Sequence, residues 1–442
     1  MNSICIREYA HIIAESNVEN SLDVCSVSKL DWEYLEKMAF SDEKQNSFIK
    51  VSQFQSEKAL KVVNYVGVIS TPYGTHIEIL PKTNVQLNQS DELDTRKLLC
   101  NMLAEVYRLP FIETKEANLE TFNKPLIEAL ISLFLTRLAS VVRRGIRKDY
   151  HRIEEEERFL RGQLLMTLQL RQPIGKQHLF QISYDIFSEN RAENRLIHSA
   201  LIQVSKWSKD EQNIKLAREL RFAFNEIPFS SNYKADFAHW QDTRDMVSYQ
   251  PLLQLVRFIL NQQSPFAIKG QHEGISFLFP MEKLFEEYVA IKLAKLLPTN
   301  LELKPQIARK FLVNKPKNAF LLKPDIAIID KKTKNIVAIL DTKWKLIDQN
   351  AQYDNGADDV KAGISQGDMY QLYAYGCKYL EGKGNLFLIY PQWEKFHQRF
   401  QFEFQDGLSL DVIPFNMKNY LDAELSLFIN SFANNTHDDA AA

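Results

Sequence analysis

Two runs of β-branched and apolar residues separated by a turn are the first clear structural signal in the chain. Residues 62–69 and 76–80 flank a Ser-Thr-Pro-Tyr-Gly segment. Pro72 pre-sets the first φ angle of a turn, and Gly74 can take a positive φ angle without steric cost. The pattern predicts a β-hairpin in a strand-rich first segment.

Helical spacing of apolar residues appears next, over residues 91–108, and it dominates from 126 to about 221. Two helices are predicted in the longer stretch, over residues 126–147 and 189–207. Ser188 is placed to cap the second of them, and the glutamate that follows it suits the first turn. The sequence therefore predicts a helical middle region.

A basic run and an acidic run are neighbours in this middle region. The basic residues lie between positions 143 and 152, and four glutamates occupy 154–157. Opposite charges at this spacing predict a solvated helix surface on which the two runs compensate each other. A phosphate-binding role for the basic run is the alternative interpretation.

Composition and charge set the protein class. The 442 residues are 45% hydrophobic and 25% charged, which is typical of a folded protein and excludes a collagenous or wholly disordered chain. At about 150 residues per domain, this length predicts two to four domains. The net charge is −2; residues 1–110 carry −4, residues 111–270 carry +4 and residues 271–442 carry −2. Such a chain does not grip nucleic acid by bulk positive charge, although it can act on DNA that a partner delivers.

Cysteines and apolar segments point to a compartment. The four cysteines lie far apart and none stands at zinc-site spacing, so free thiols in a reducing compartment are expected. Residues 1–10 lack the apolar core of a signal peptide. The longest apolar stretch, 126–142, is interrupted by Glu128 and Arg137 and is short for a membrane span. We expect a cytoplasmic protein without membrane contact.

The segment 323–345 carries the most informative chemistry. Two apolar, β-branched runs flank a polar turn in it, which is the signature of a hairpin. If the turn centres on Thr333, Asp325 and Asp341 lie opposite one another, with their Cβ atoms about 4.5–5.5 Å apart on one face. Strand alternation places Lys343 on the same face.

Two carboxylates and an amine at one end of a hairpin favour a metal site. Like charges so close are unfavourable unless a cation lies between them, and hard oxygen ligands favour Mg²⁺ or Mn²⁺. The competing interpretation treats the acids as ordinary strand-end residues and the lysine as a surface charge. Pro324 before the first acid and the aligned register favour the metal site.

These residues resemble a known nuclease motif. Pro324-Asp325 and Asp341-Thr342-Lys343 are similar to the two halves of the motif that names the PD-(D/E)XK nuclease superfamily. The resemblance implies that Asp325 and Asp341 hold the metal, and that Lys343 positions or deprotonates the attacking water or stabilises the phosphorane oxygens.

A tyrosine-rich helix is predicted over residues 366–379. Gln371 and Tyr375 are four residues apart and share one face of it. They resemble the Q-x-x-x-Y element of RecB-like members of the superfamily. By that resemblance Gln371 orients the scissile phosphate or water, and Tyr375 supports the helix face. Ordinary amphipathic packing of the tyrosines is the alternative.

The superfamily often adds an acid from a helix before the hairpin, and residues 280–297 form an amphipathic pattern there. Two arguments select different residues. The helical wheel favours Glu282, whereas resemblance to an M-x-x-L-F-E pattern favours Glu286. Glu286 is the predicted third metal ligand, and Glu282 is its substitute.

An ordered series of motifs extends over most of the chain. It comprises G-V-I at 67–69, Y-G-T-H-I-E-I-L-P-K at 73–82, L-R-G at 160–162, the segments 190–201 and 281–289, and the 323–345 hairpin. Over roughly residues 60–400 the series resembles the McrC family, the nuclease subunits of McrBC modification-dependent restriction systems.

This family resemblance implies a partner. The partner, McrB, is an AAA+ GTPase hexamer that recognises modified cytosine in double-stranded DNA and translocates it, while McrC cuts. GTP would be bound by the partner, because no G-x-x-x-x-G-K-[ST] phosphate loop occurs here. The family's amino-terminal region docks into the GTPase ring, which makes residues 1–115 the partner-binding candidate. A purely structural β-domain is the alternative for that segment, and a homodimer through the nuclease domain is also expected.

The predicted architecture is multidomain and combines α+β with α/β parts. It consists of a β-rich domain at 1–115, a helical middle region at 116–265, a PD-(D/E)XK restriction-endonuclease-like α/β domain at 266–430 and a disordered tail at 431–442. The predicted activity is Mg²⁺-dependent cleavage of modified DNA together with the GTPase. The alternatives are a stand-alone RecB-like nuclease and a non-catalytic subunit that stimulates the GTPase.

Overall fold

The computed structural model describes residues 3–15, 18–41, 48–83, 89–107, 125–241, 243–261, 275–350, 360–405 and 407–419. The predicted tail at 431–442 lies outside these ranges. The chain divides into two compact units, of which one combines Met1–Leu126 with Ser264–Ala442 and the other is Ile127–Gln263. The first unit therefore contains segments from both ends of the chain.

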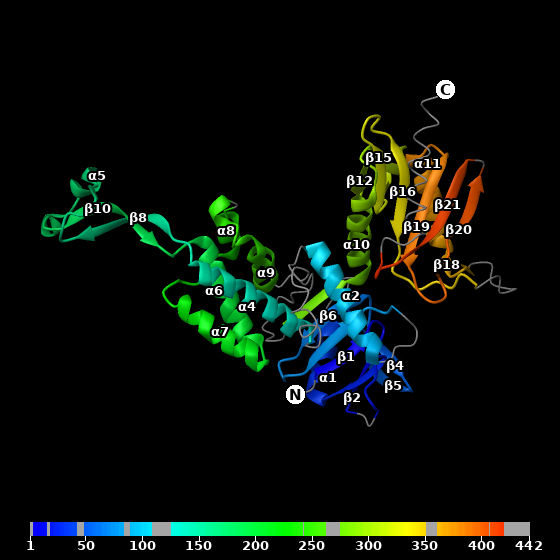
Figure 1. Cartoon of the computed structure of the whole chain (residues 1–442), viewed down its shortest axis with the longest axis horizontal. Helices are drawn as coiled ribbons and strands as arrows, with labels where there is room; N and C mark the ends of the chain where they lie inside the picture. Colours follow the sequence, from blue (N-terminus) through cyan, green and yellow to red (C-terminus); the bar gives the residue numbers. More distant parts are fainter. Residues whose placement is uncertain are drawn as a thin grey trace. The chain divides into compact units, whose positions relative to one another are not determined.

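Two four-stranded sheets build the amino-terminal part of the first unit (Figure 1). One has the order β1-β7-β6-β11, with bounds Ser3–Arg7, His76–Leu80, Tyr65–Ser70 and Ile275–Pro280. The other has the order β3-β2-β5-β4, with bounds Val24–Val27, His11–Ala14, Glu57–Val62 and Ile49–Phe54. Helices α1 (Lys29–Ser41) and α2 (Gln89–Tyr107) complete this part. Both sheets and α1 contribute side chains to one apolar core.

The sequence predictions for this part are confirmed with one shift. β6 and β7 pair antiparallel, as the turn chemistry predicted. The hairpin begins at Tyr65 rather than at residue 62, because Val62 ends the preceding strand β5. The helix predicted over 91–108 is α2. Strand β11 adds to the free edge of β6, although the whole second unit separates them in sequence.

A six-stranded sheet builds the carboxyl-terminal part of the first unit (Figure 1). Its order is β12-β15-β16-β19-β21-β20, with bounds Leu301–Pro305, Ile326–Asp330, Ile336–Thr342, Gly384–Pro391, Leu408–Phe415 and Phe400–Gln405. β15 and β16 are antiparallel, whereas β19 pairs in parallel with both β16 and β21. Two small hairpins, β13 (Lys310–Val313) with β14 (Ala319–Leu322) and β17 (Val360–Lys361) with β18 (Ile364–Ser365), lie outside this sheet.

Helices α10 (Met281–Leu296) and α11 (Gln366–Tyr379) cover opposite faces of this sheet. Leu372 of α11 shares a core with Leu410 of β21. Phe285 of α10 packs against Phe415, which has the opposite parity in the same strand. Successive strand residues point to opposite faces, so the sheet lies between the two helices. This explains why its central strands are apolar throughout.

The second unit combines helices with a small sheet. Its helices are α4 (Leu126–Arg144), α6 (Ala192–Trp207), α7 (Glu211–Ala223), α8 (Tyr233–Ala238) and α9 (Gln250–Asn261). The sheet has the order β8-β10-β9, with bounds Asp149–Glu157, Phe180–Ser188 and Gln163–Leu164. The short helix α5 (Met166–Gln169) and the 3₁₀ turn η1 (Ile174–Lys176) lie between β9 and β10, and the 3₁₀ turn η2 (Arg244–Met246) lies between α8 and α9.

The prediction of a charged helix surface in this unit is wrong. The four glutamates at 154–157 lie on strand β8 and pair with residues 180–183 of β10. Glu156 forms its ion pair with Lys176, at 2.8 Å, rather than with the basic run. Four consecutive glutamates suit a solvated helix equally well, and only the distant partner strand selects the extended form.

The predicted start of the following helix is also wrong. β10 continues to Ser188, whose Oγ accepts a hydrogen bond from the Asn190 amide at 3.1 Å. α6 starts at Ala192 with Arg191 in the N-cap position, and its first-turn acid is Glu193 instead of Glu189. Pairing of Ser188 with Asp149 keeps the backbone extended past the predicted cap.

The four cysteines are free thiols, which confirms the prediction from their spacing. Within the described ranges, no helix combines the length and the apolar composition needed to cross a membrane.

Candidate active site

The register of β15 and β16 brings two aspartates together. Ile326 pairs with Leu340, so the next step of the same register places Asp325 opposite Asp341. The pairs from Ile326 to Ile328 therefore confirm the predicted turn centre at Thr333, and a bulge between Ile328 and Ile329 shifts the register only beyond them. Asp325 is held in place because its Oδ2 accepts hydrogen bonds from the amide and the hydroxyl of Thr342, at 2.8 and 2.9 Å.

Asp341 is a buried carboxylate whose one close polar partner among the described residues is Lys343. Its side chain is 1% exposed, and Lys343 Nζ lies 2.6 Å from Oδ2. Apart from this contact with Lys343, neither carboxylate oxygen has a hydrogen-bonding partner among the described residues. Burial, followed by the charge of Asp325, raises the pKa of Asp341 to about 7. A dehydrated carboxylate beside a second one fits a divalent cation, because the cation removes both penalties.

Lys343 lies on the same face, as strand alternation predicted. Burial lowers its pKa, but the charges of Asp341 and Asp325 outweigh burial, so the net shift is upward. The amine is therefore a cation that points at the two carboxylates. Asp368, in the first turn of α11, lies 4.0 Å from the same amine.

Of the two candidate helix acids, the structure brings Glu286 toward the aspartates. Burial and then the charge of Asp325 raise the pKa of Glu286, and Gln306 Nε2 donates to its Oε1 at 2.9 Å. Glu282 instead accepts a hydrogen bond from Asn64 Nδ2 at 2.9 Å, beside the amino-terminal sheets. In the described part of the chain, no three His, Cys, Asp or Glu side chains form a ready-made metal cluster. A metal here would keep water ligands, as Mg²⁺ commonly does.

The predicted helix pair on α11 also lies at the site. Gln371 Nε2 donates to the Tyr375 hydroxyl at 2.7 Å, and that hydroxyl donates to the Lys323 carbonyl at 3.1 Å. Burial raises the pKa of Tyr375, and the charges of Asp341 and Asp325 raise it further. Tyr375 therefore holds the chain two residues before Asp325, and Gln371 is bound to Tyr375 from one turn earlier on α11.

Two further residues at the site, Asp368 and Tyr390, were not predicted from the sequence. Asp368 precedes Gln371 by three residues and so shares its helix face, a spacing that could have revealed it. The Tyr390 hydroxyl is buried without a hydrogen-bond partner among the described residues. Burial, followed by the charges of Asp368 and Asp341, raises its pKa. Nothing in the apolar pattern of β19 distinguishes Tyr390 from its neighbours.

A buried glutamate from the amino-terminal part supports the site from outside. Glu8 follows β1, and its Oε2 accepts hydrogen bonds from Trp344 Nε1 at 2.8 Å and from the Lys82 amide at 3.0 Å. Trp344 directly follows Lys343, and its ring centroid lies 5.3 Å from that of Phe285, the neighbour of Glu286. Through Trp344, Glu8 thus supports both the segment that carries Lys343 and helix α10, which carries Glu286.

Replacing Glu8 by glutamine should remove a pH dependence of stability. Burial raises the pKa of Glu8 from 4.5 to about 7. As pH rises through this window, the Glu8 carboxyl ionises first in the unfolded chain. The free energy of unfolding of the wild type should therefore fall by about 3 kcal/mol, and Glu8→Gln should not show this loss. Thermal unfolding midpoints between about pH 5 and pH 8 measure the difference. Glu57→Gln, an exposed acid of β5, is the matched control, and equal pH profiles for Glu8→Gln and the wild type would contradict the assignment.

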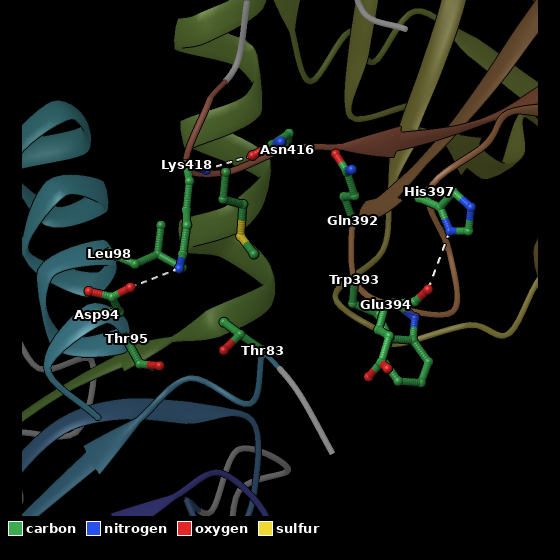
Figure 2. A pocket seen from close by; sticks show the side chains of 11 residues that line it. Thr83, Asp94, Thr95, Leu98, Gln392, Trp393, Glu394, His397, Asn416 and Lys418 are labelled. Atoms are coloured by element: carbon green, nitrogen blue, oxygen red, sulfur yellow. Dashed lines mark hydrogen bonds and ion pairs between the residues drawn. The ribbon is translucent and has the colours of Figure 1, made fainter. Parts of the chain in front are cut away.

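A separate pocket in the first unit does not contain these residues. It has a volume of about 460 Å³ and lies between α2 and the segment that follows β21 (Figure 2). Lys418 Nζ donates to Asp94 at 3.0 Å across one side, and Glu394 and His397 lie on the other (Figure 2). With two carboxylates against one ammonium, the lining has no excess positive charge for a phosphate group.

Comparison with known proteins assigns the family. A protein-family model described as McrBC 5-methylcytosine restriction system component matches residues 60–391. The chain belongs to this family. No functionally curated protein matches the chain.

Solved structures of this McrBC family share the fold. McrC in a half-complex from a tetradecameric assembly of Thermococcus gammatolerans McrB AAA+ hexamers superposes with a TM-score of 0.70. It has 19% sequence identity, over 98% of this chain and 100% of that one. The Thermococcus gammatolerans McrBC complex gives a TM-score of 0.50 at 22% identity, over 66% of this chain and 87% of that one. The chain is thus a mixed α/β protein with a McrC-like fold.

Proposed function

We propose that this chain is the DNA-cutting subunit of a McrBC-type restriction system and that it hydrolyses phosphodiester bonds of modified DNA with Mg²⁺. The observation that carries the proposal is the buried carboxylate of Asp341, which lies opposite Asp325 and has Lys343 as its one polar partner among the described residues. The single Lys343 ammonium balances only one of these two carboxylates, and burial makes the excess negative charge costly, so a purely structural role explains the pair poorly. Family membership supports the restriction context.

The proposed roles follow from the contacts. Asp325 and Asp341 would hold Mg²⁺, with Glu286 as the third acid. Bound there, Mg²⁺ would acidify water and offset charge on the pentavalent transition state. The Lys343 ammonium can donate to a phosphoryl oxygen or orient the attacking water. Gln371 already donates to Tyr375, which leaves its carbonyl oxygen to accept from that water.

A plasmid-cleavage assay tests the proposal. Methylated and unmethylated plasmids are compared with Mg²⁺, with and without the AAA+ partner and GTP, for the wild type and Asp341→Ala. Cutting of methylated plasmid only with the partner is expected. Cutting with Mg²⁺ alone would favour a stand-alone nuclease. Restriction that survives in Asp341→Ala and Lys343→Ala would favour a non-catalytic, GTPase-stimulating subunit.

We further propose that the β8-β10-β9 sheet of the second unit contacts an AAA+ partner. In this proposal the partner binds GTP, and this chain does not. Large apolar side chains are exposed on this sheet and its connections, namely Tyr150, Phe159, Leu160, Met166, Leu168, Leu170, Ile174 and Phe187. Figure 1 shows the sheet and α5 extending away from the helices of this unit. Exposed apolar patches of this kind mark protein interfaces. Residues 1–115 stay the other candidate for partner binding.

Replacing Ile174 by aspartate should reduce stimulation of the partner's GTPase about tenfold or more, because a charge in an apolar interface loses its hydration. Ile174 is 87% exposed, so the fold should tolerate the change. Phe222→Asp is the matched control, since Phe222 is 86% exposed on α7 of the same unit. GTP hydrolysis is measured with increasing amounts of each variant. Equal stimulation by Ile174→Asp and the control would exclude this surface.

A further inference from the structure

The segment that leads into Asp325 is strongly basic. Between Leu303 and Pro324 it contains no acidic residue and six basic ones, namely Lys304, Arg309, Lys310, Lys315, Lys317 and Lys323. All except Lys304 are exposed. Lys304 has a loose ion pair with Glu302 at 3.7 Å, and the other five form no ion pair with any described residue. This positive charge contrasts with the net charge of −2 over residues 271–442.

The β13 and β14 hairpin presents this charge on an ordered frame. Lys310 pairs with Leu322 and Val313 pairs with Ala319, so the lysines at 315 and 317 lie in the connecting turn. Phe320 is 73% exposed and Leu321 is 50% exposed on the same hairpin. Exposed apolar side chains among lysines suit a ligand that offers both phosphates and apolar sugar and base surfaces.

Helix α11 holds the base of this hairpin beside the candidate active site. The Tyr379 hydroxyl donates to the Leu322 carbonyl at 2.7 Å and accepts from the Arg309 amide at 3.1 Å. One turn earlier, Tyr375 donates to the Lys323 carbonyl at 3.1 Å. The same helix carries Gln371, so the hairpin and the site share a support.

One of the basic residues, Lys323, lies at the edge of the site itself. Lys323 is exposed, lies two residues before Asp325 and is held there by the hydrogen bond that its carbonyl accepts from Tyr375 at 3.1 Å. A DNA backbone bound at the carboxylates would therefore also lie near the positive charge of Lys323. This matters because the carboxylates alone repel phosphate.

We propose that residues 304–323 form a duplex-DNA-binding arm that holds phosphates next to the candidate carboxylates. The proposal rests on the proposed DNA-cutting function and names how the substrate is held. Charge complementarity selects DNA, since about ten phosphates per helical turn and strand offer contacts to a spaced set of lysines. An acidic surface of the partner protein is the alternative occupant.

The test is DNA binding by the full-length chain. Fluorescence anisotropy with a labelled duplex, without divalent metal and over a range of KCl concentrations, compares the wild type with Lys315→Gln/Lys317→Gln. Loss of two phosphate contacts should reduce affinity about ten- to hundredfold near 0.1 M salt and lower the slope of log K against log salt by about 1 to 2. Lys315→Arg/Lys317→Arg should restore both values.

A matched control lies in the turn between β15 and β16. Lys332→Gln/Lys334→Gln removes two exposed charges from the turn at the other end of β15 and β16, and it should bind as the wild type does. Equal loss in both double variants would show a bulk charge effect and overturn the arm. Wild-type DNA binding with lost GTPase stimulation in Lys315→Gln/Lys317→Gln would assign the hairpin to the partner and also overturn it. Binding is measured without cutting, so failure of Asp341→Ala to abolish cleavage is a separate result that concerns only the proposed function.

Discussion

Replacing Asp341 by alanine should reduce DNA cleavage by about a thousandfold or more without unfolding the protein. Cleavage should disappear because the variant loses the more buried of the two carboxylates that would hold Mg²⁺. The fold should survive because the wild type buries this charge at a cost, as the upward pKa shift from burial and from Asp325 indicates. Above the raised pKa the ionised carboxylate destabilises the folded state, so the thermal unfolding midpoint of the variant near pH 8 should equal or exceed that of the wild type.

The fold should also tolerate Lys343, which pairs with Asp341 in the wild type. Lys343 has 29% side-chain exposure and lies 4.0 Å from Asp368, so it is not left as an isolated buried charge. Asp341→Asn, which keeps the size of the side chain, should behave in the same way. Plasmid cleavage with the AAA+ partner gives the rate, and a thermal unfolding curve gives the stability.

Asp411→Ala is the matched control for Asp341. Asp411 lies on β21 of the same sheet, and burial raises its pKa too, but it belongs to no candidate cluster. This variant should cut about as fast as the wild type. Wild-type cleavage by Asp341→Ala would remove the metal-site assignment, and an equal loss in Asp411→Ala would attribute the effect to the fold.

Replacing Gly67 by alanine should destabilise the first unit by about 4 kcal/mol, enough to prevent accumulation of folded protein. Gly67 lies in the middle of β6 with a φ angle of +131°, which favours glycine. A Cβ atom there would lie 1.8 Å from the Phe277 carbonyl oxygen of β11. Both strands belong to a sheet, so neither backbone can move away without breaking ladder hydrogen bonds.

Gly145→Ala separates the two causes. Gly145 also has a positive φ angle, +92°, but a Cβ there meets no atom within 4 Å. This control should cost only about 1 kcal/mol, from backbone strain alone. Thermal unfolding midpoints and soluble yield compare the two variants. A Gly67→Ala protein as stable as Gly145→Ala would mean that the close approach of β6 and β11 is absent.

Local patterns predicted much of the candidate site. The short polar turn around Thr333 sets the register of two β-branched strands, so Asp325, Asp341 and Lys343 could be aligned from sequence. The four-residue spacing likewise placed Gln371 and Tyr375 on one helix face. In each case the interacting residues are close in sequence, and backbone periodicity alone determines which side chains meet.

Other features could not be predicted because the residues that determine them are distant in sequence. A helical wheel could not choose between Glu282 and Glu286, since the choice depends on Asn64 near one and on Asp325 and Gln306 near the other. The glutamates at 154–157 became a strand only through pairing with β10. Amphipathic and charged patterns state which residues avoid water, and they leave the identity of the neighbour open.

The sequence by itself determined the hairpin that presents the two aspartates and the lysine, together with the family to which the motifs belong. Only the tertiary structure decided that Glu8 supports Trp344 and that Tyr379 holds a basic hairpin beside the acids. It also decided that residue 67 must be glycine, because β11 passes too close to it for a Cβ atom. The physical reason is the range of the interactions. Turn chemistry and strand alternation act over a few residues, whereas these contacts join residues from about 70 to more than 300 positions apart, which only the packed chain brings together.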